Sequence, residues 1–153
     1  MNLHKLSHQM VWGILLTLLL VGCSANKSQP EMIEVTFNGN GCAVSGLTDL
    51  PPGDHSFLFK DMTEEEMVLY VYRIVDGHTF QDMVDAQSEP GDLTPYPDWV
   101  RQQPLVDQTW DEALGGEVHT FGLEKEGTYA ILLLSRKNLW TCAPLQIIGE
   151  PSG

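Results

Sequence analysis

The stretch Thr128-Tyr129-Ala130-Ile131-Leu132-Leu133-Leu134 is the most apolar of the strands that the sequence predicts downstream of residue 32. Residues 124–127 precede it as a hairpin turn, and residues 67–74 form a second, mostly apolar stretch that is rich in β-forming residues. Stretches of this kind are typical of strands in the interior of a sheet. The two together predict the centre of a β-sheet fold.

Shorter predicted strands lie on both sides of this centre. In residues 33–37, Ile33, Val35 and Phe37 alternate with polar residues, as in a half-buried strand. Turn residues follow at 38–41 and at 51–54. Further strands are predicted at 42–44, 55–60, 118–123 and 139–148. Six or seven short strands separated by turns favour a mainly β fold, an antiparallel β-sandwich.

The middle of the chain breaks this pattern. Thr79 is a predicted helix cap, with Asp82 three residues later as in a capping box. The buried face of the helix is expected to hold Phe80, Met83 and Val84. Residues 87–117 contain many prolines and glycines and predict a long irregular excursion, with a helical turn at 97–101. One or two short helices are therefore expected within this part of the sandwich.

The N-terminus has the pattern of an export signal. Lys5 precedes an apolar run over residues 10–21, which is shorter than the about 20 residues that a membrane-spanning helix needs. The run closes on Leu20-Val21-Gly22-Cys23, which resembles the lipobox of bacterial lipoproteins. The resemblance implies a signal helix, cleavage between Gly22 and Cys23, and lipidation of Cys23.

This resemblance implies a location and a division of the chain. Residues 1–22 are the expected signal peptide, 23–32 the lipidated cysteine and a polar tether, 33–149 the sandwich and 150–153 a tail. The acylated Cys23 is expected to anchor an extracytoplasmic domain in the lipid bilayer. Ser24 favours the outer membrane over the cell membrane where two membranes exist.

Assigning Cys23 to lipid leaves Cys42 and Cys142. A single pair in an exported domain predicts a disulfide between the first and last strand regions. The competing interpretation is a pair of metal-binding thiolates, although the chain shows no Cys-x-x-Cys or Cys–His ligand spacing. The formal charge of −13 provides no basic patch for phosphates, so the chain is not expected to bind nucleic acid.

Four short motifs are similar to those of small bacterial and archaeal lipoproteins with cupredoxin-like domains. They are Val44-Ser45-Gly46 and residues 51–57, 76–82 and 126–130. The similarity implies an extracytoplasmic Greek-key β-sandwich, often without a known activity. A type 1 copper site also needs histidines and usually a methionine. Neither residue type follows Cys142, so type 1 copper and electron transfer are not expected. No motif for another cofactor is present either, so none is expected.

Two groups of residues are candidates for binding. Tyr96, Trp99 and Trp110 lie in the mid-chain excursion, where aromatic side chains bind a ligand or protein partner, or else pack as a small satellite core. The alternative function is metal handling by His55, His78 and His119, with His119 expected on an exposed strand face.

Motifs for catalysis are missing from the sequence, including Gly-x-Ser-x-Gly, His-Glu-x-x-His and a Cys–His pair with a free thiol. The chain is therefore expected to be a non-catalytic binding module, with a ligand or another envelope protein as its partner.

Overall fold

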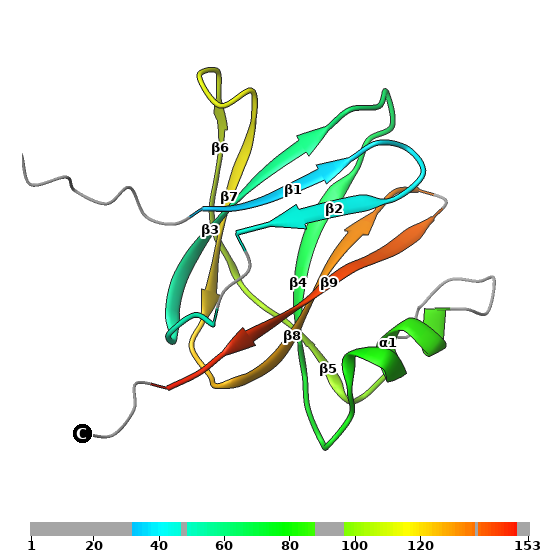
Figure 1. The fold of residues 1–153 in the computed structure, drawn as a ribbon, viewed down its shortest axis with the longest axis vertical. Helices are drawn as coiled ribbons and strands as arrows, with labels where there is room; N and C mark the ends of the chain where they lie inside the picture. The colour runs from blue at the N-terminus through cyan, green and yellow to red at the C-terminus, as the bar shows by residue number, and fades with distance from the viewer. Residues whose placement is uncertain (1–31, 47–48, 88–96, 137, 150–153) are drawn as a thin grey trace, which may run out of the picture.

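The computed structural model describes residues 32–46, 49–87, 97–136 and 138–149 (Figure 1). The secondary structure elements, in chain order, are β1 (Ile33–Phe37), β2 (Cys42–Ser45), β3 (Gly53–Asp61), β4 (Val68–Ile74), α1 (Phe80–Gln87), β5 (Val100–Gln102), β6 (Leu105–Asp111), β7 (Gly116–Leu123), β8 (Gly127–Leu134) and β9 (Leu139–Ile147). The sequence prediction of a mainly β fold is confirmed, and strands form at every predicted position.

The strands form two sheets that face each other. The five-stranded sheet has the order β2-β1-β3-β7-β6, and the four-stranded sheet has the order β5-β4-β8-β9. The pairs are antiparallel except that β1 runs parallel to β3, with Ile33 beside Phe57 and Phe37 beside Asp61. The prediction of a wholly antiparallel sandwich was therefore wrong for this pair. The alternation that predicts each strand does not encode the direction of its neighbour.

The main core lies between the sheets. It includes Val35 and Phe37 from β1, Phe57 from β3, Leu69 from β4 and Tyr129 from β8, all of which are buried. Burying apolar surface of this extent is the dominant favourable term in folding. The hydroxyl of Tyr129 is satisfied at the edge of this core, where it donates to the Lys125 carbonyl at 2.5 Å.

A second core covers the outer face of the four-stranded sheet. There Met83 of α1 packs with Tyr72 of β4, Val100 of β5 and Leu132 of β8. In β8, odd-numbered residues face the main core and even-numbered residues face this second core. A strand buried on both faces has no polar face, which explains the apolar sequence of residues 128–134.

Helix α1 begins at the predicted cap. The Thr79 N–H donates to Asp82 Oδ2 at 2.7 Å, and the Asp82 N–H donates to Thr79 Oγ1 at 3.2 Å. These reciprocal bonds form a capping box and satisfy two backbone donors that the first helical turn leaves free. Met83 is buried as predicted, whereas Phe80 and Val84 are half-buried.

The predicted irregular excursion over 87–117 was wrong for its second half. Residues 100–102 form β5 and residues 105–111 form β6, so the predicted helical turn at 97–101 is a turn that leads into a strand. Gln103 and Pro104 carry the chain from one sheet to the other. The Gln103 N–H donates to the Val71 carbonyl in β4, and the Pro104 carbonyl accepts from the Gly122 N–H in β7. A strand that changes sheets at a proline shows little periodicity, because its two halves face different surroundings.

Candidate functional site

The two described tryptophans of the candidate aromatic group have different surroundings. Trp99 is half-buried against the second core and stacks on His78, with ring centroids 4.3 Å apart and an interplanar angle of 16°. Trp110 lies in β6 with 64% of its surface exposed. Tyr96 is outside the described residues. Trp99 therefore packs as part of a satellite core, and Trp110 is the one of the two that presents its ring to solvent.

The exposure of Trp110 follows from the position of β6. This strand pairs with β7 alone, and Trp110 lies opposite Glu117 in that register. Opposite residues of an antiparallel pair project from the same face of the sheet. Glu117 shares its face with His119 and Phe121, which point toward the main core. Trp110 therefore stands on the inward face of the five-stranded sheet, at the outer end of the hairpin that lies at the upper left in Figure 1.

Two further apolar side chains are exposed on β6. Leu105 is 48% exposed and Val106 is 56% exposed. A register shift between Leu105 and Asp107 makes a bulge that leaves Val106 without a direct partner in β7. Val106 lies on the outer face of the sheet beside Gly122, whereas Leu105 and Trp110 share the inward face. Single exposed apolar residues are ordinary on protein surfaces, but here three lie along one edge strand, and exposed apolar surface can mark an interaction site.

His119 is buried, with only 2% of its surface exposed, so the prediction of an exposed face was wrong. Its Nε2 lies 3.0 Å from Glu117 Oε2, and the same carboxylate oxygen accepts a bond from Gln108 Nε2 at 3.0 Å. Its ring also contacts Phe59 and Phe121. His119 Nδ1 is buried and has no hydrogen-bond partner within the described part of the chain.

Burial lowers the pKa of the His119 imidazole below its ordinary value of 6.5, because it penalises the charged ring more than the hydrogen bond and charge of Glu117 favour it. The neutral ring then donates one hydrogen to the carboxylate, which fixes its orientation under β6. His119 thus supports the inner face of the hairpin and is inaccessible to solvent.

The other two candidate histidines have separate surroundings. His55 Nε2 lies 2.7 Å from the Pro51 carbonyl, at the start of β3. His78 lies before α1, with Nδ1 3.7 Å from Asp82 Oδ2. Hydrogen bonds from Thr79, chiefly from its backbone N–H, hold the pKa of Asp82 below its usual value. Over residues 32–46, 49–87, 97–136 and 138–149, no three His, Cys, Asp or Glu side chains come together as metal ligands.

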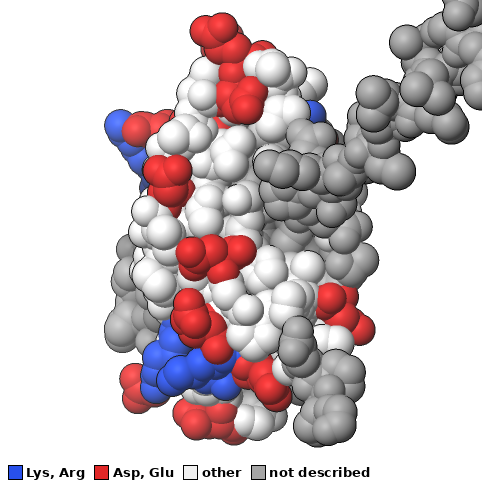
Figure 2. All heavy atoms as spheres, turned by 90° about the vertical axis from the view of Figure 1, so that its left-hand side faces the viewer, with Lys and Arg blue, Asp and Glu red and all other residues white. Residues whose placement is uncertain are grey.

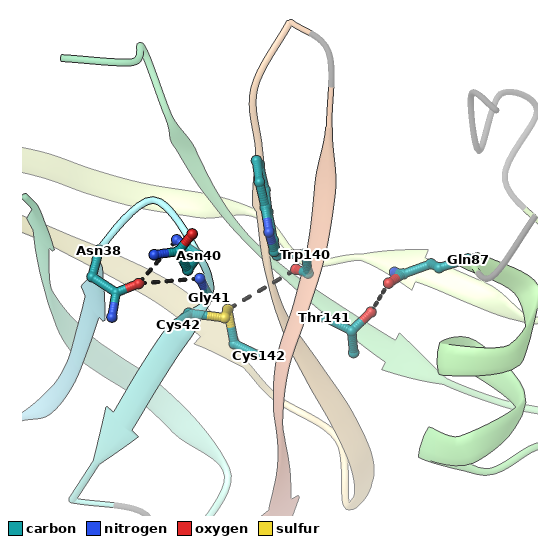
Figure 3. Close-up of a disulfide and its surroundings, with 8 residues drawn as sticks. All are labelled: Asn38, Asn40, Gly41, Cys42, Gln87, Trp140, Thr141 and Cys142. Atoms are coloured by element: carbon teal, nitrogen blue, oxygen red, sulfur yellow. Dashed lines mark hydrogen bonds between the residues drawn. A yellow bond between two sulfur atoms is a disulfide. The ribbon is translucent and has the colours of Figure 1, made fainter. Parts of the chain in front are cut away.

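Cys42 and Cys142 form a disulfide, with Cα atoms 5.4 Å apart across a sequence separation of 100 residues (Figure 3). Cys142 sits in a bulge of β9, because its neighbours Thr141 and Ala143 pair with the consecutive residues Leu132 and Ile131 of β8. A bulge re-aims the extra side chain, and here Cys142 reaches β2 of the opposite sheet. The predicted disulfide is confirmed, and neither sulfur remains as a thiolate for metal.

The predicted lipidation site at Cys23 and the cleavage site after Gly22 lie outside the described residues. None of the helices in the described residues could span a bilayer.

Glu117 and Gln108 were not identified from the sequence as the polar neighbours of His119. The alternation Glu117, His119, Phe121 contained a signal, since Phe121 is apolar and the three residues share one face of a strand.

A scan against protein-family models and a search of the curated proteins both find no match to this chain.

Proposed function

We propose that this chain is an extracytoplasmic lipoprotein, anchored through an acylated Cys23, whose β-sandwich binds a partner without catalysing a reaction. The observation that supports binding most strongly is the exposed ring of Trp110 on an edge strand that also exposes Leu105 and Val106. Tryptophan is among the residues most enriched at the energetic centres of interfaces. The five-stranded sheet holds this ring in place through the register of β6 with β7.

The proposed location is supported by cysteine usage. The Cys42–Cys142 disulfide is a bond typical of proteins outside the reducing cytosol. It accounts for two of the three cysteines and leaves Cys23 of the lipobox-like motif for lipid. A chain of formal charge −13 is repelled by anionic headgroups, so the sandwich is expected to stand away from the bilayer surface.

A finer proposal concerns the fold itself. The two sheets and the capped helix are consistent with a cupredoxin-like Greek-key sandwich that lacks type 1 copper. Two observations support this version. Cys142 is held in the disulfide, and the bond from Tyr129 to the carbonyl four residues upstream resembles the tyrosine corner of β-sandwiches.

Pull-down of envelope extract on the full-length chain in detergent tests the binding proposal. Trp110→Ala is expected to lose bound proteins that the unmodified chain retains, with an unchanged melting temperature. Trp99→Ala is the matched control, because this ring packs against the second core. That variant is expected to melt at a lower temperature and to keep its partner at temperatures where it is folded. Equal retention by Trp110→Ala and the unmodified chain would remove the support for a site on β6.

Mass spectrometry of the protein from its native host tests the anchor. The N-terminal peptide is expected to begin at Cys23 and to carry diacylglycerol with or without a further acyl chain. Cys23→Ser is expected to leave the signal segment uncleaved and the cysteine lipid absent. An unmodified Cys23 in the membrane fraction would contradict the proposed anchor and would leave the binding proposal untouched.

A further inference from the structure

The four edge strands of the two sheets differ in how well they are shielded. β2 has four residues and is joined to β9 by the disulfide, and β9 contains a bulge and Pro144, which has no N–H to donate. β5 has only three residues. β6 has seven residues, all exposed except the half-buried Asp111. Within the described residues, β6 is thus the longest edge strand that carries neither a cross-link nor a proline, and its bulge at Val106 leaves residues 107–111 in regular register.

The β6–β7 hairpin, residues 105–123, is also strongly acidic. It contains Asp107, Asp111, Glu112 and Glu117, and neither lysine nor arginine. Figure 2 shows the side of the molecule on which the hairpin lies, where acidic side chains are spread along its whole height and basic ones are fewer, most of them near the lower end. An extended segment that pairs with β6 therefore meets a negative potential, which favours a positively charged partner.

The side chains of β6 define what such a segment would contact. Leu105, Gln108 and Trp110 lie opposite Phe121, His119 and Glu117 and share their face of the sheet. Asp107 and Thr109 lie opposite Thr120 and Val118, on the other face. A partner strand is therefore offered Leu105 and Trp110, with Gln108 between them, on one face and the Asp107 carboxylate on the other. Alternating apolar and basic residues match these two rows.

Charge disfavours a second copy of this chain at the same edge, most strongly in one register. In an antiparallel pairing of two β6 strands centred on Thr109, Asp107 of one copy would lie opposite Asp111 of the other. Like charges directly opposite each other in a sheet are destabilising. Each copy also carries a formal charge of −13, which opposes close association.

We infer that β6 is a docking edge for an extended, lysine- or arginine-bearing segment of another protein, which adds to the five-stranded sheet as a sixth strand. Main-chain hydrogen bonds to β6 supply affinity and the two side-chain rows supply specificity, as in other cases of strand addition. This inference rests on the proposed binding function and adds the mode of binding and the chemistry of the partner.

Fluorescence anisotropy with labelled peptides tests the inference on the full-length chain in detergent. The probe is a peptide of about eight residues, enough to span β6, in which lysine alternates with valine or tyrosine. Its controls are the same peptide with glutamate in place of lysine, and a version with every second backbone amide methylated. We expect binding of the lysine peptide alone, because the first control reverses the charge and the second removes main-chain donors.

A charge-reversal pair localises the site. Asp107→Lys combined with Glu112→Lys neutralises the hairpin and is expected to weaken binding by about tenfold, as reversal of two exposed charge contacts allows. Glu64→Lys combined with Glu65→Lys changes the net charge equally on the β3–β4 connection and is expected to leave affinity unchanged. Hydrogen exchange is expected to slow over residues 105–111 with bound peptide, and not over residues 42–45.

Three results would overturn the inference. Equal binding of the methylated peptide would exclude strand addition, and equal weakening by both charge pairs would exclude β6 as the site. A concentration-dependent dimer that Val106→Lys disrupts would assign the edge to a second copy. If no peptide binds while the Trp110-dependent pull-down succeeds, this inference fails and the proposed binding function stands. If the lysine peptide binds β6 while the pull-down retains no Trp110-dependent protein, the strand-addition inference stands and the pull-down evidence for the binding function fails.

Discussion

The two long sides of the sandwich connect the sheets in different ways. On one side the edge strands β2 and β9 are tied by the Cys42–Cys142 disulfide, and Trp140 of β9 packs edge-to-face on Phe37 of β1, with centroids 4.8 Å apart. On the other side the chain itself passes from β5 to β6 through Pro104. The first side is cross-linked and partly buried. The second leaves β6 exposed along its length.

This difference separates stability from recognition. A cross-link between residues 100 positions apart restricts the unfolded chain, so the disulfide side contributes to the free energy of unfolding whether or not a partner is present. Exposed β6 side chains bury little surface in the free protein and contribute little to its stability. Variants on the disulfide side should therefore lower the melting temperature, and variants on β6 should weaken partner binding.

The largest effect is expected from removing the cross-link. Cys42→Ser combined with Cys142→Ser should lower the free energy of unfolding by about 2–5 kcal/mol, because the unfolded chain regains the entropy that a loop of this length had lost. Circular dichroism melting of the full-length chain in detergent measures the change. Binding of the lysine peptide well below the melting temperature is the control and should persist. An unchanged melting temperature would contradict a stabilising role for the disulfide.

The next effect compares one tryptophan from each side. Trp140→Ala should cost about 2–3 kcal/mol, because it removes a half-buried ring from its contact with Phe37. Trp110→Ala should stay within about 0.5 kcal/mol, since a substitution at an exposed position disturbs few contacts. Denaturant unfolding of both variants gives the two values. Similar losses in the two variants would mean that the two sides are not specialised as described.

A smaller effect concerns pH on the β6 side. Burial lowers the pKa of His119, so below pH 6.5 the unfolded chain binds a proton more readily than the folded chain. The contribution of this group to stability is therefore constant above that pH and is lost as the pH falls through the folded pKa. His119→Gln has no such group and should show a shallower loss of stability between about pH 7 and about pH 5.

Unfolding curves of the unmodified chain and of His119→Gln across this range give the comparison. Glutamine retains an amide donor for Glu117, so the variant separates titration from loss of the hydrogen bond. Parallel pH profiles for the two chains would show that the imidazole is not desolvated as the structure indicates.

A further small effect is expected at the corner where the chain passes between the sheets. Pro104→Ala keeps the carbonyl that accepts from Gly122, so the folded contact remains. The variant should lose about 0.4–1 kcal/mol because alanine gives the unfolded chain more conformations. A thermal melt measures this loss. A loss as large as that of the disulfide variant would show that the corner, too, is a main determinant of stability.

Much of the architecture was predictable because it depends on local patterns. The alternation of residues 33–37, the apolar run of 128–134 and the capping box at Thr79 each encode one element through its own hydrogen bonds or burial. The disulfide was predictable by counting cysteines. Strands β5 and β6 were not, because prolines and glycines surround them and β6 has no buried face to impose alternation.

The candidate site was predictable only in part. Trp99 and Trp110 are equivalent in sequence terms, as aromatic residues in a proline-rich segment. Their difference arises because Trp99 meets the second core, whereas the inward face around Trp110 meets no covering strand within the described residues. His119 was misplaced for a related reason. Its neighbour Glu117 suggested an exposed face, but the carboxylate lies at the margin of the core and accepts the imidazole hydrogen bond.

The sequence by itself determined a mainly β chain, the positions of seven of its strands and the pairing of Cys42 with Cys142, since these follow from local periodicity and from composition. Only the tertiary structure decided that β1 runs parallel to β3, that Pro104 carries the chain between sheets, and that Trp110 is exposed. Those features depend on which elements meet across the sandwich. Contacts between residues that are distant in the sequence produce no local pattern from which they could be predicted.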